Sequence, residues 1–183
     1  VVMVRQFDED AVLNEVLKVF WTQGWQATSM ADLAEAAQVQ RGSLYHAYGG
    51  KEQLFALAFE RYAARVLEEA QHALDASSAR LALHQFFDVL IADMTADEPP
   101  RGCFTTRTAL ESEVIGPQMQ GRVRMLVDRL EAVIAQALSR DTFRESLAVS
   151  PESAAQTAIV FTRGLALMER LHHEPQRLRE MAD

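Results

Sequence analysis

One stretch of the sequence, residues 36–51, combines hydrogen-bonding and basic side chains with a complete absence of acidic residues. Arg41, His46 and Lys51 can supply positive charge there. Hydrogen-bonding groups come from Gln40, Ser43, Tyr45 and His46, and Gly42 allows a backbone to approach closely. Donors and cations of this kind bind phosphate oxygens and the edges of bases. The stretch therefore predicts a surface that binds a nucleic acid, with Lys51 at the start of a helix as a phosphate ligand.

Short helices must position these side chains. A stripe of apolar residues at three- and four-residue spacing predicts a helix from Asp8 to Gln23, which Gly24 is expected to end. Ser29 and Asp32 have the spacing of a capping box, which predicts a second helix that reaches about Ala37. A third helix is expected over 41–48, after a tight turn over 38–40. Two short helices joined by such a turn are typical of a helix-turn-helix.

The remainder of the chain is also predicted to be helical. Helices are expected over about 51–76 and along the apolar stripe from Leu83 to Met94. Further helices are expected over 103–113, 118–140, 151–172 and 174–183, with a loop at 97–102. We therefore predict an all-α protein, in which a three-helix head is joined by a long helix to a larger helical bundle. The expected domains are residues 1–50 and 51–183.

Composition limits the classes of protein. The chain has 183 residues, 18 Lys+Arg against 26 Asp+Glu, and a formal net charge of −8. At first sight, this acidic net charge argues against a nucleic acid as the partner. The charge of the acid-free stretch decides whether a nucleic acid can bind there, however, and the net charge predicts only that non-specific binding is weak. No apolar run is long enough to cross a membrane. The single cysteine allows no intrachain disulfide. These points favour a cytoplasmic protein.

Motifs of other chemistry are missing from the sequence. It contains no His-Glu-x-x-His pair, no phosphate-binding glycine loop and no nucleophile elbow. We therefore expect no catalytic residues, no metal site and no cofactor, and we do not expect an enzyme.

The run from Ala27 to Phe55, which includes Leu44-Tyr45-His46-x-Tyr48-x-x-Lys51, resembles the N-terminal DNA-binding signature of the TetR family of transcriptional regulators. The resemblance covers about residues 7–62. This chain has Tyr48 where the family usually has Phe. It has Ala47 where Tyr or His is common, and Ala47 cannot make the contact with the DNA backbone that the longer side chain allows. The resemblance implies a homodimer, a palindromic double-stranded DNA operator, and repression relieved by a small molecule bound in the C-terminal bundle.

Carried over by position, the resemblance implies a set of DNA-facing residues, of which Gln40 and Arg41 read bases and the others hold phosphates. Arg5 is a further candidate, as an arm in the minor groove. The alternative is that these are solvated polar residues of an ordinary helical hairpin. Tyr48 is expected in the core. The predicted DNA-binding residues are Ser29, Gln40, Arg41, Gly42, Ser43, Tyr45, His46 and Lys51.

The C-terminal part carries weaker signals. Apolar stripes within 118–140 and 151–172 suit a dimer interface, although both could equally face the core of one subunit. A ligand pocket is expected among these and the preceding helices, with plain core packing as the alternative for each residue. The candidate apolar wall and polar anchors are Phe86, Leu90, Met94, Cys103, Phe104, Arg107, Thr108, Glu111, Met125 and Phe161.

Cys103 is expected at the N-terminus of a helix beside Arg101, where the helix dipole and a cation favour a reactive thiolate. The surrounding Arg-Gly-Cys-Phe run also resembles a branch of the family with members that respond to electrophiles or oxidants. A small, unreactive buried side chain is the alternative. The rival function for the whole chain is a helical small-molecule or electrophile sensor whose head does not bind DNA.

Overall fold

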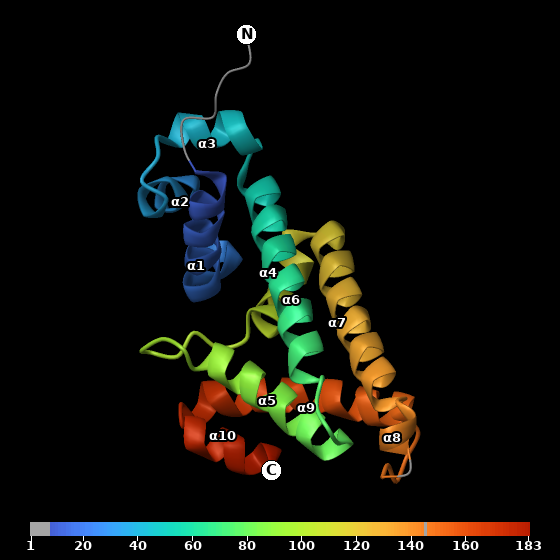
Figure 1. The fold of residues 1–183 in the computed structure, drawn as a ribbon. Helices are drawn as coiled ribbons and strands as arrows, with labels where there is room; N and C mark the ends of the chain where they lie inside the picture. The colour runs from blue at the N-terminus through green and yellow to red at the C-terminus, as the bar shows by residue number, and fades with distance from the viewer. Residues whose placement is uncertain (1–7, 145) are drawn as a thin grey trace. The chain divides into compact units, whose positions relative to one another are not determined.

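A computed structural model describes residues 8–144 and 146–183, and in that part the chain forms helices and no strand. The predicted all-α class is therefore confirmed (Figure 1). Arg5 lies outside the described residues. The helices are α1 (Glu9–Ala27), α2 (Met30–Ala36), α3 (Arg41–Tyr48), α4 (Lys51–Ala73), α5 (Ala79–Met94), α6 (Phe104–Ile115), α7 (Pro117–Leu138), α8 (Asp141–Arg144), α9 (Pro151–His172) and α10 (Pro175–Ala182).

Gly24 interrupts the first helix, as predicted, but the helix does not end there. Gly24 adopts φ 81° and ψ 178°, but α1 bends there and resumes until Ala27. The left-handed φ suits a residue without a Cβ atom, and groups from another helix, described below, replace the hydrogen bonding that the bend interrupts. The structure also ends α4 at Ala73, three residues before the predicted end, and adds the single turn α8.

The chain forms two compact units: residues 1–63 with 107–120, and residues 64–106 with 121–183. The predicted domain boundary at residue 50 falls inside the first unit, because α4 begins at Lys51 and its first half packs with α1. We call the first unit the head unit and the second the bundle unit.

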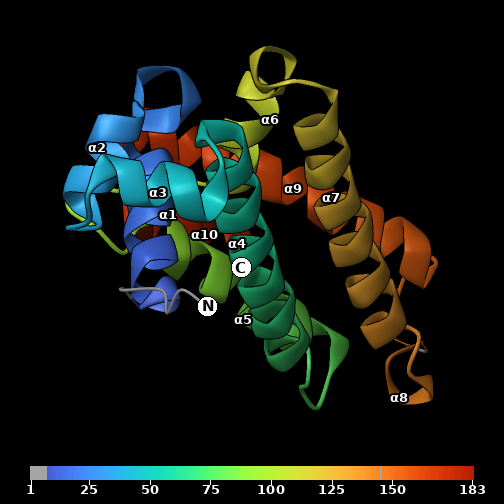
Figure 2. The same cartoon turned by 90° about the horizontal axis from the view of Figure 1, so that it is seen from above.

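Aromatic rings form much of the core of the head unit, in which α1 packs against α2 and α2 against α3 (Figure 2). Phe20 and Phe55 meet edge to face with ring centroids 4.6 Å apart, and Trp21 meets Tyr62 at 5.0 Å. Leu44 is fully buried on α3. Edge-to-face pairs of this kind contribute about 0.5–1.5 kcal/mol beyond their buried area. The short helices are thus held by a rigid apolar base.

In the bundle unit, α5, α9 and α10 pack against one another. Phe86, Ile91 and Leu165 are buried there, and Phe87 meets Phe161 edge to face at 5.2 Å. Ser150 caps the start of α9 by accepting a hydrogen bond from the backbone N–H of Ser153. The apolar stripes predicted on the long helices thus contribute to the core of this unit.

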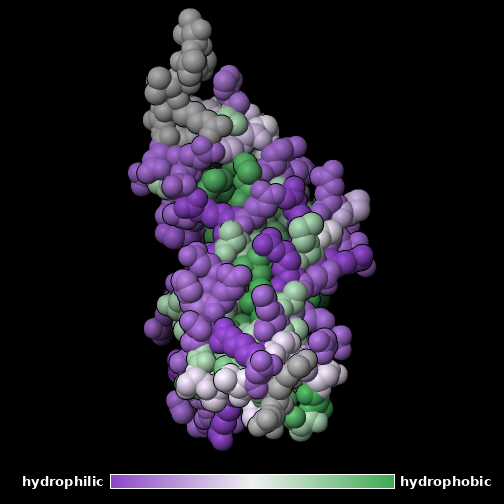
Figure 3. All heavy atoms as spheres, turned by 45° about the vertical axis from the view of Figure 1, so that its right-hand side comes forward, coloured by the Kyte–Doolittle hydropathy of each residue, from purple (hydrophilic) through white to green (hydrophobic). Residues whose placement is uncertain are grey.

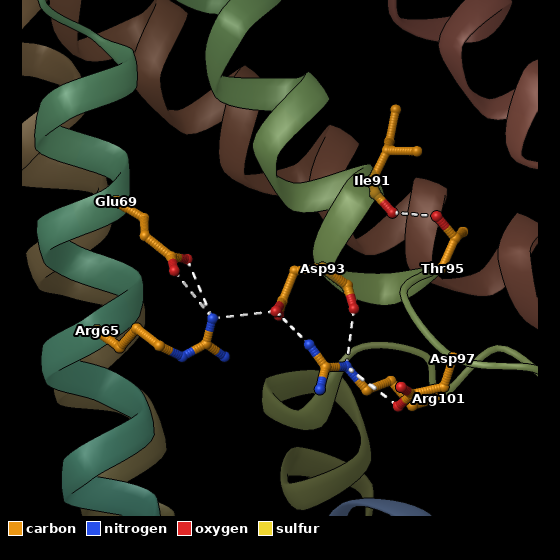
Figure 4. A network of polar contacts seen from close by, with 7 residues as sticks. All are labelled: Arg65, Glu69, Ile91, Asp93, Thr95, Asp97 and Arg101. Atoms are coloured by element: carbon orange, nitrogen blue, oxygen red, sulfur yellow. Dashed lines mark hydrogen bonds and ion pairs between the residues drawn. The ribbon is translucent and has the colours of Figure 1, made fainter.

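A polar network joins α4, α5 and the following loop of the bundle unit (Figure 4). The Asp93 carboxylate accepts hydrogen bonds from Arg65 at 3.0 Å and from Arg101 at 2.6 Å, and Glu69 accepts from Arg65 at 3.0 Å. Burial opposes the charge of Arg65, but the neighbouring negative charges of Asp93 and Glu69 outweigh it and raise the pKa of Arg65 above its ordinary value. The network therefore ties the loop before α6 to α4.

Hydrophilic side chains cover most of the molecular face in Figure 3, with hydrophobic side chains visible between them. Among the described residues, no helix is both long enough and apolar enough to span a membrane.

Candidate nucleic-acid interface

The start of α2 is held by a reciprocal pair of hydrogen bonds. The Ser29 hydroxyl accepts from the backbone N–H of Asp32 at 3.2 Å, and the Asp32 carboxylate accepts from the backbone N–H of Ser29 at 2.7 Å. The predicted capping box is confirmed. The bonds from Ser29 lower the pKa of Asp32 because they favour its charged form. The Ser29 side chain is thereby fixed at an exposed helix N-terminus, with its hydroxyl hydrogen still available to a ligand.

Helix α3 presents most of the predicted DNA-facing residues. Gln40 is its N-cap, and the amide makes no capping hydrogen bond. Leu44 and Tyr48 turn inward and are buried, which confirms the predicted core position of Tyr48. The outward side chains are exposed, with Ser43 half-buried, and a Cβ atom added at Gly42 would meet no other atom within 4 Å. The exposed positions of this helix are Gln40, Arg41, Gly42, Tyr45 and His46.

Arg41 and Tyr45 stand one turn apart on α3 and touch each other. The Arg41 guanidinium carbon lies 5.7 Å from the centroid of the Tyr45 ring, within the range of a cation–π contact. Stacking limits the directions in which the guanidinium points. It therefore reduces the entropy that this side chain would lose on binding.

Lys51 is the first residue of α4, and its ammonium group lies over an aromatic ring. The Nζ atom is 4.2 Å from the centroid of the Trp25 ring. Partial burial lowers the pKa of Lys51, while the negative charges of Glu52, Glu111 and Asp32 oppose that effect. The charge is thus held at a defined place and is incompletely solvated, so that binding to an anion costs less desolvation than for a free lysine.

These elements surround a hollow of about 520 Å³ on the head unit. Two helix N-termini, those of α2 and α4, open onto it, and each presents backbone N–H groups with a partial positive charge. Donors and cations on this surface suit an oxygen-rich anion such as a backbone phosphate. We call it the phosphate cradle; its lining is Thr28, Ser29, Met30, Ala31, Arg41, Tyr45, Gly50, Lys51 and Glu52.

The cradle brings together four of the eight predicted residues, namely Ser29, Arg41, Tyr45 and Lys51. The other four, Gln40, Gly42, Ser43 and His46, lie on or next to α3 but do not line it. Their DNA contacts remain predictions.

Sequence reasoning missed Trp25, whose ring contacts the Lys51 ammonium group. The reason is that the first helix was expected to stop at Gly24, which left Trp25 in a connection without a defined place. An aromatic residue directly after that glycine was the only available signal. Glu52 was also missed, and its carboxylate is the one negative charge in the cradle lining.

The predicted ligand-pocket residues divide between the two units. Phe86, Met94 and Phe104 are buried in the bundle unit. Leu90 and Phe161 are half-buried there, and Met125 is 60% exposed. Thr108 belongs to the head unit, where its hydroxyl is buried without a hydrogen-bond partner. Their role in ligand binding remains a prediction.

Arg107 and Glu111 also belong to the head unit, and both bind the backbone of α1. Arg107 donates to the carbonyl oxygens of Trp21 and Thr22, while Glu111 accepts from the backbone N–H of Trp25. Their role as ligand anchors remains a prediction; in the structure their side chains bind the backbone of α1.

Cys103 lies directly before α6 and is half-buried. Arg101, the expected neighbour of its thiol, instead donates to Asp93 (Figure 4). The cation nearest the thiol in the described contacts is Arg163 of α9, whose Nη1 lies 3.9 Å from Sγ and 3.2 Å from the Thr106 hydroxyl. The basic side chain that contacts the thiol is therefore Arg163, 60 positions along the chain, in place of the Arg101 named from the sequence, and the reactivity of the thiol remains a prediction.

Two family models match the chain. Residues 12–58 match "Bacterial regulatory proteins, tetR family", and residues 79–183 match "Tetracyclin repressor-like, C-terminal domain". The HTH-type transcriptional repressor ComR of Escherichia coli K12 is 33% identical over 142 residues, which span 74% of this chain and 68% of that protein.

Solved structures have the same fold. The regulator CifR, bound to a 26-bp double-stranded operator, is 28% identical with a TM-score of 0.82, covering 98% of this chain and 95% of that one. Reduced Escherichia coli NemR has a TM-score of 0.82 over 95% of this chain and 94% of its own, and at 18% identity the likeness concerns the fold alone.

Proposed function

We propose that this chain, which belongs to the TetR family of bacterial regulatory proteins, is a homodimeric repressor that binds a palindromic operator and is released by a small molecule. That it is a DNA-binding transcriptional regulator follows from the family. The dimer, the operator contacts and the release are the proposed parts.

The phosphate cradle is the observation that carries the proposal. Two helix N-termini and Lys51 meet around one hollow of the head unit, and its lining also includes Arg41. Such a site anchors a phosphate and thereby sets the register of α3 on a duplex. CifR, which is similar over almost the whole chain, was solved with operator DNA.

In this proposal, Gln40 and Arg41 read base edges in the major groove. They stand at the N-terminus of α3, the part of a recognition helix that reaches bases. Arg41→Ala should lose discrimination at particular base pairs, by about 1–3 kcal/mol for each lost bidentate contact. A uniform loss of affinity over all sequences would instead assign Arg41 to a phosphate.

A stripe on α9 supports the dimer. Val160, Leu167 and Leu171 are 70%, 54% and 63% exposed, and their spacing of seven and four residues places them on one face. Gly164 lies between them, with open space at its Cβ position, which permits close approach of another helix. A two-fold interface along α9 and α7 would bury this stripe and set the spacing of the two reading heads.

The proposed effector site lies in the bundle unit, where Phe86, Met94 and Phe104 supply apolar surface and Cys103 lies beside Arg163. A ligand releases DNA only if it binds the DNA-incompetent form more tightly, since equal affinity for both forms shifts nothing.

The test is a gel shift with the promoter DNA that adjoins the chain's own gene, followed by selection from a pool of random duplexes. We expect a specific complex, a selected site with two-fold symmetry, and loss of both with the double variant Arg41→Ala, Lys51→Ala. A chain that is folded and dimeric but recovers no preferred sequence would contradict the proposal and favour the sensor without DNA binding.

A further inference from the structure

The backbone of α1 is not helical at Gly24, and the backbone N–H of Trp25 and the carbonyl oxygen of Trp21 lie on opposite sides of this bend. Both groups find a charged side chain from α6. The Glu111 carboxylate accepts from the Trp25 N–H at 2.8 Å, and Arg107 Nη1 donates to the Trp21 oxygen at 2.5 Å. Helix α6 thus supplies a charged partner to a backbone group on each side of the bend, and such charge-assisted bonds are stronger than neutral ones.

Two further contacts complete the bend. Arg107 also donates to the Thr22 oxygen at 2.8 Å, and the Thr28 hydroxyl donates to the Gly24 oxygen at 2.6 Å. Arg107 and Glu111 are four residues apart and therefore share one face of α6. All of these residues belong to the head unit. We call Arg107 and Glu111 the α6 clamp.

Space as well as conformation favours glycine at position 24. A Cβ atom there would lie 2.7 Å from Glu111 Oε1 and 3.2 Å from Arg107 Nε, closer than atoms of these kinds approach without a shift. Its φ of 81° is also in the left-handed region. The glycine therefore lets the two charged side chains reach the α1 backbone.

One residue, Trp25, contacts both the α6 clamp and Lys51 of the phosphate cradle. The Trp25 backbone is bound by Glu111, and the Trp25 ring meets the Phe55 ring edge to face at 5.3 Å. On the same ring lies the Lys51 ammonium group, 4.2 Å from the centroid. Trp25 is only 8% exposed, so its ring has little freedom to move without its backbone.

We propose that Arg107 and Glu111 are positioning residues for DNA binding: they hold the Trp25 ring as the platform that aims Lys51 into the phosphate cradle. The inference rests on the proposed function, since it assigns Lys51 to a DNA phosphate. It assigns these two residues to the control of affinity, not to contact with DNA or effector.

The experiment is a double-mutant cycle between Glu111→Ala and Lys51→Ala, with a labelled random-sequence duplex at low salt as the probe of phosphate contacts. Glu111→Ala should weaken binding by about threefold to tenfold, within the range of coupled neighbours. In the Lys51→Ala background the same substitution should change affinity by less than about twofold. Glu113→Ala is the matched control, because it removes the same charge from an exposed position of α6, and it should leave affinity near that of the unmodified chain.

An equal loss in both backgrounds would overturn the inference, because a general loss of folding does not depend on Lys51. If Glu111→Ala loses its helical circular dichroism signal, Arg107→Gln takes its place in the cycle under the same criterion. Glu111→Gln keeps an acceptor for the Trp25 N–H and should recover part of the affinity. Failure of the unmodified chain to bind any duplex would count against the proposed function instead.

A second measurement, tryptophan fluorescence, reports on the surroundings of the Trp25 ring. The chain has two tryptophans, so that Trp21→Phe leaves Trp25 as the only indole emitter. Addition of duplex should change its emission as a phosphate binds the Lys51 charge beside the ring, and Lys51→Ala should abolish the change. An emission change that persists without Lys51, or none in its presence, would refute the link.

Discussion

Removal of the Lys51 charge is the most direct test of the phosphate cradle. The ammonium group lines the hollow and lies 4.2 Å from the Trp25 ring centroid, where partial burial lowers its pKa. Lys51→Ala removes one phosphate contact per half-site. The slope of log affinity against log salt concentration should therefore become shallower by about 0.9 for each subunit that contacts DNA.

The size of the effect can be worked out for one subunit. A fourfold rise in salt changes its logarithm by about 0.6, so a slope difference of about 0.9 corresponds to a factor of about 3.5. The affinity advantage of the unmodified chain over Lys51→Ala should thus shrink about 3.5-fold when salt is raised from about 50 to about 200 mM. All sequences should be affected alike, because phosphates are common to them.

The assay is fluorescence anisotropy with a labelled duplex over a series of salt concentrations. Lys18→Ala is the matched control, because it removes the same charge from α1, where Lys18 is 65% exposed and paired with Glu15. We expect its slope to equal that of the unmodified chain. If Lys51→Ala also keeps that slope, Lys51 does not contact a phosphate, and the reasoning from the cradle fails.

Three further predictions concern stability and assembly. The pKa of Asp32 is lowered in the folded state, so its capping contribution to stability is present above the unfolded pKa of about 3.8 and disappears as pH falls through the folded pKa. The difference in melting temperature between Asp32→Ala and the unmodified chain should therefore shrink in acid. A difference that stays constant with pH would contradict this prediction. Asp93→Ala removes the carboxylate that Arg65 and Arg101 share, while Arg65 keeps Glu69 and Arg101 keeps Asp97 at 3.7 Å; urea unfolding should show a loss of about 1–3 kcal/mol after allowance for partial exposure. The control Asp97→Ala, 54% exposed and 3.7 Å from its partner, should cost under about 0.5 kcal/mol, and equal losses would remove the network from the stability of the loop. Leu167→Glu on the exposed stripe of α9 should convert a dimer to a monomer in sedimentation, whereas Leu110→Glu, on a residue 75% exposed on α6, should not; a dimer that survives Leu167→Glu would place the interface elsewhere.

Local signals predicted well whatever depends on neighbours in the sequence. The capping box at Ser29 and Asp32 forms as predicted, because its bonds join residues only three apart. Helix α3 begins and ends at the predicted residues, and Tyr48 is buried. Helical periodicity and caps act within one or two turns, so no distant contact is needed to recognise them.

The errors occur where a distant residue decides the outcome. Gly24 was expected to end a helix, since local rules place glycine at such ends. Glu111, 86 residues after Trp25, supplies the acceptor that lets α1 continue past the bend. In the same way, Arg101 is a sequence neighbour of Cys103, yet its side chain turns to Asp93, and Arg163 reaches the thiol instead.

The sequence by itself determined the helical class, the family, and the acid-free surface that α3 presents, because these follow from short-range periodicity and from residue types. Only the tertiary structure decided that Ser29, Arg41, Tyr45 and Lys51 line one hollow, and that Trp25 lies beneath the lysine. It also showed that Arg107 and Glu111 bind the backbone of α1. The physical reason is that a charged side chain binds whichever polar group packing leaves without a partner, and packing brings together residues that are far apart in the chain.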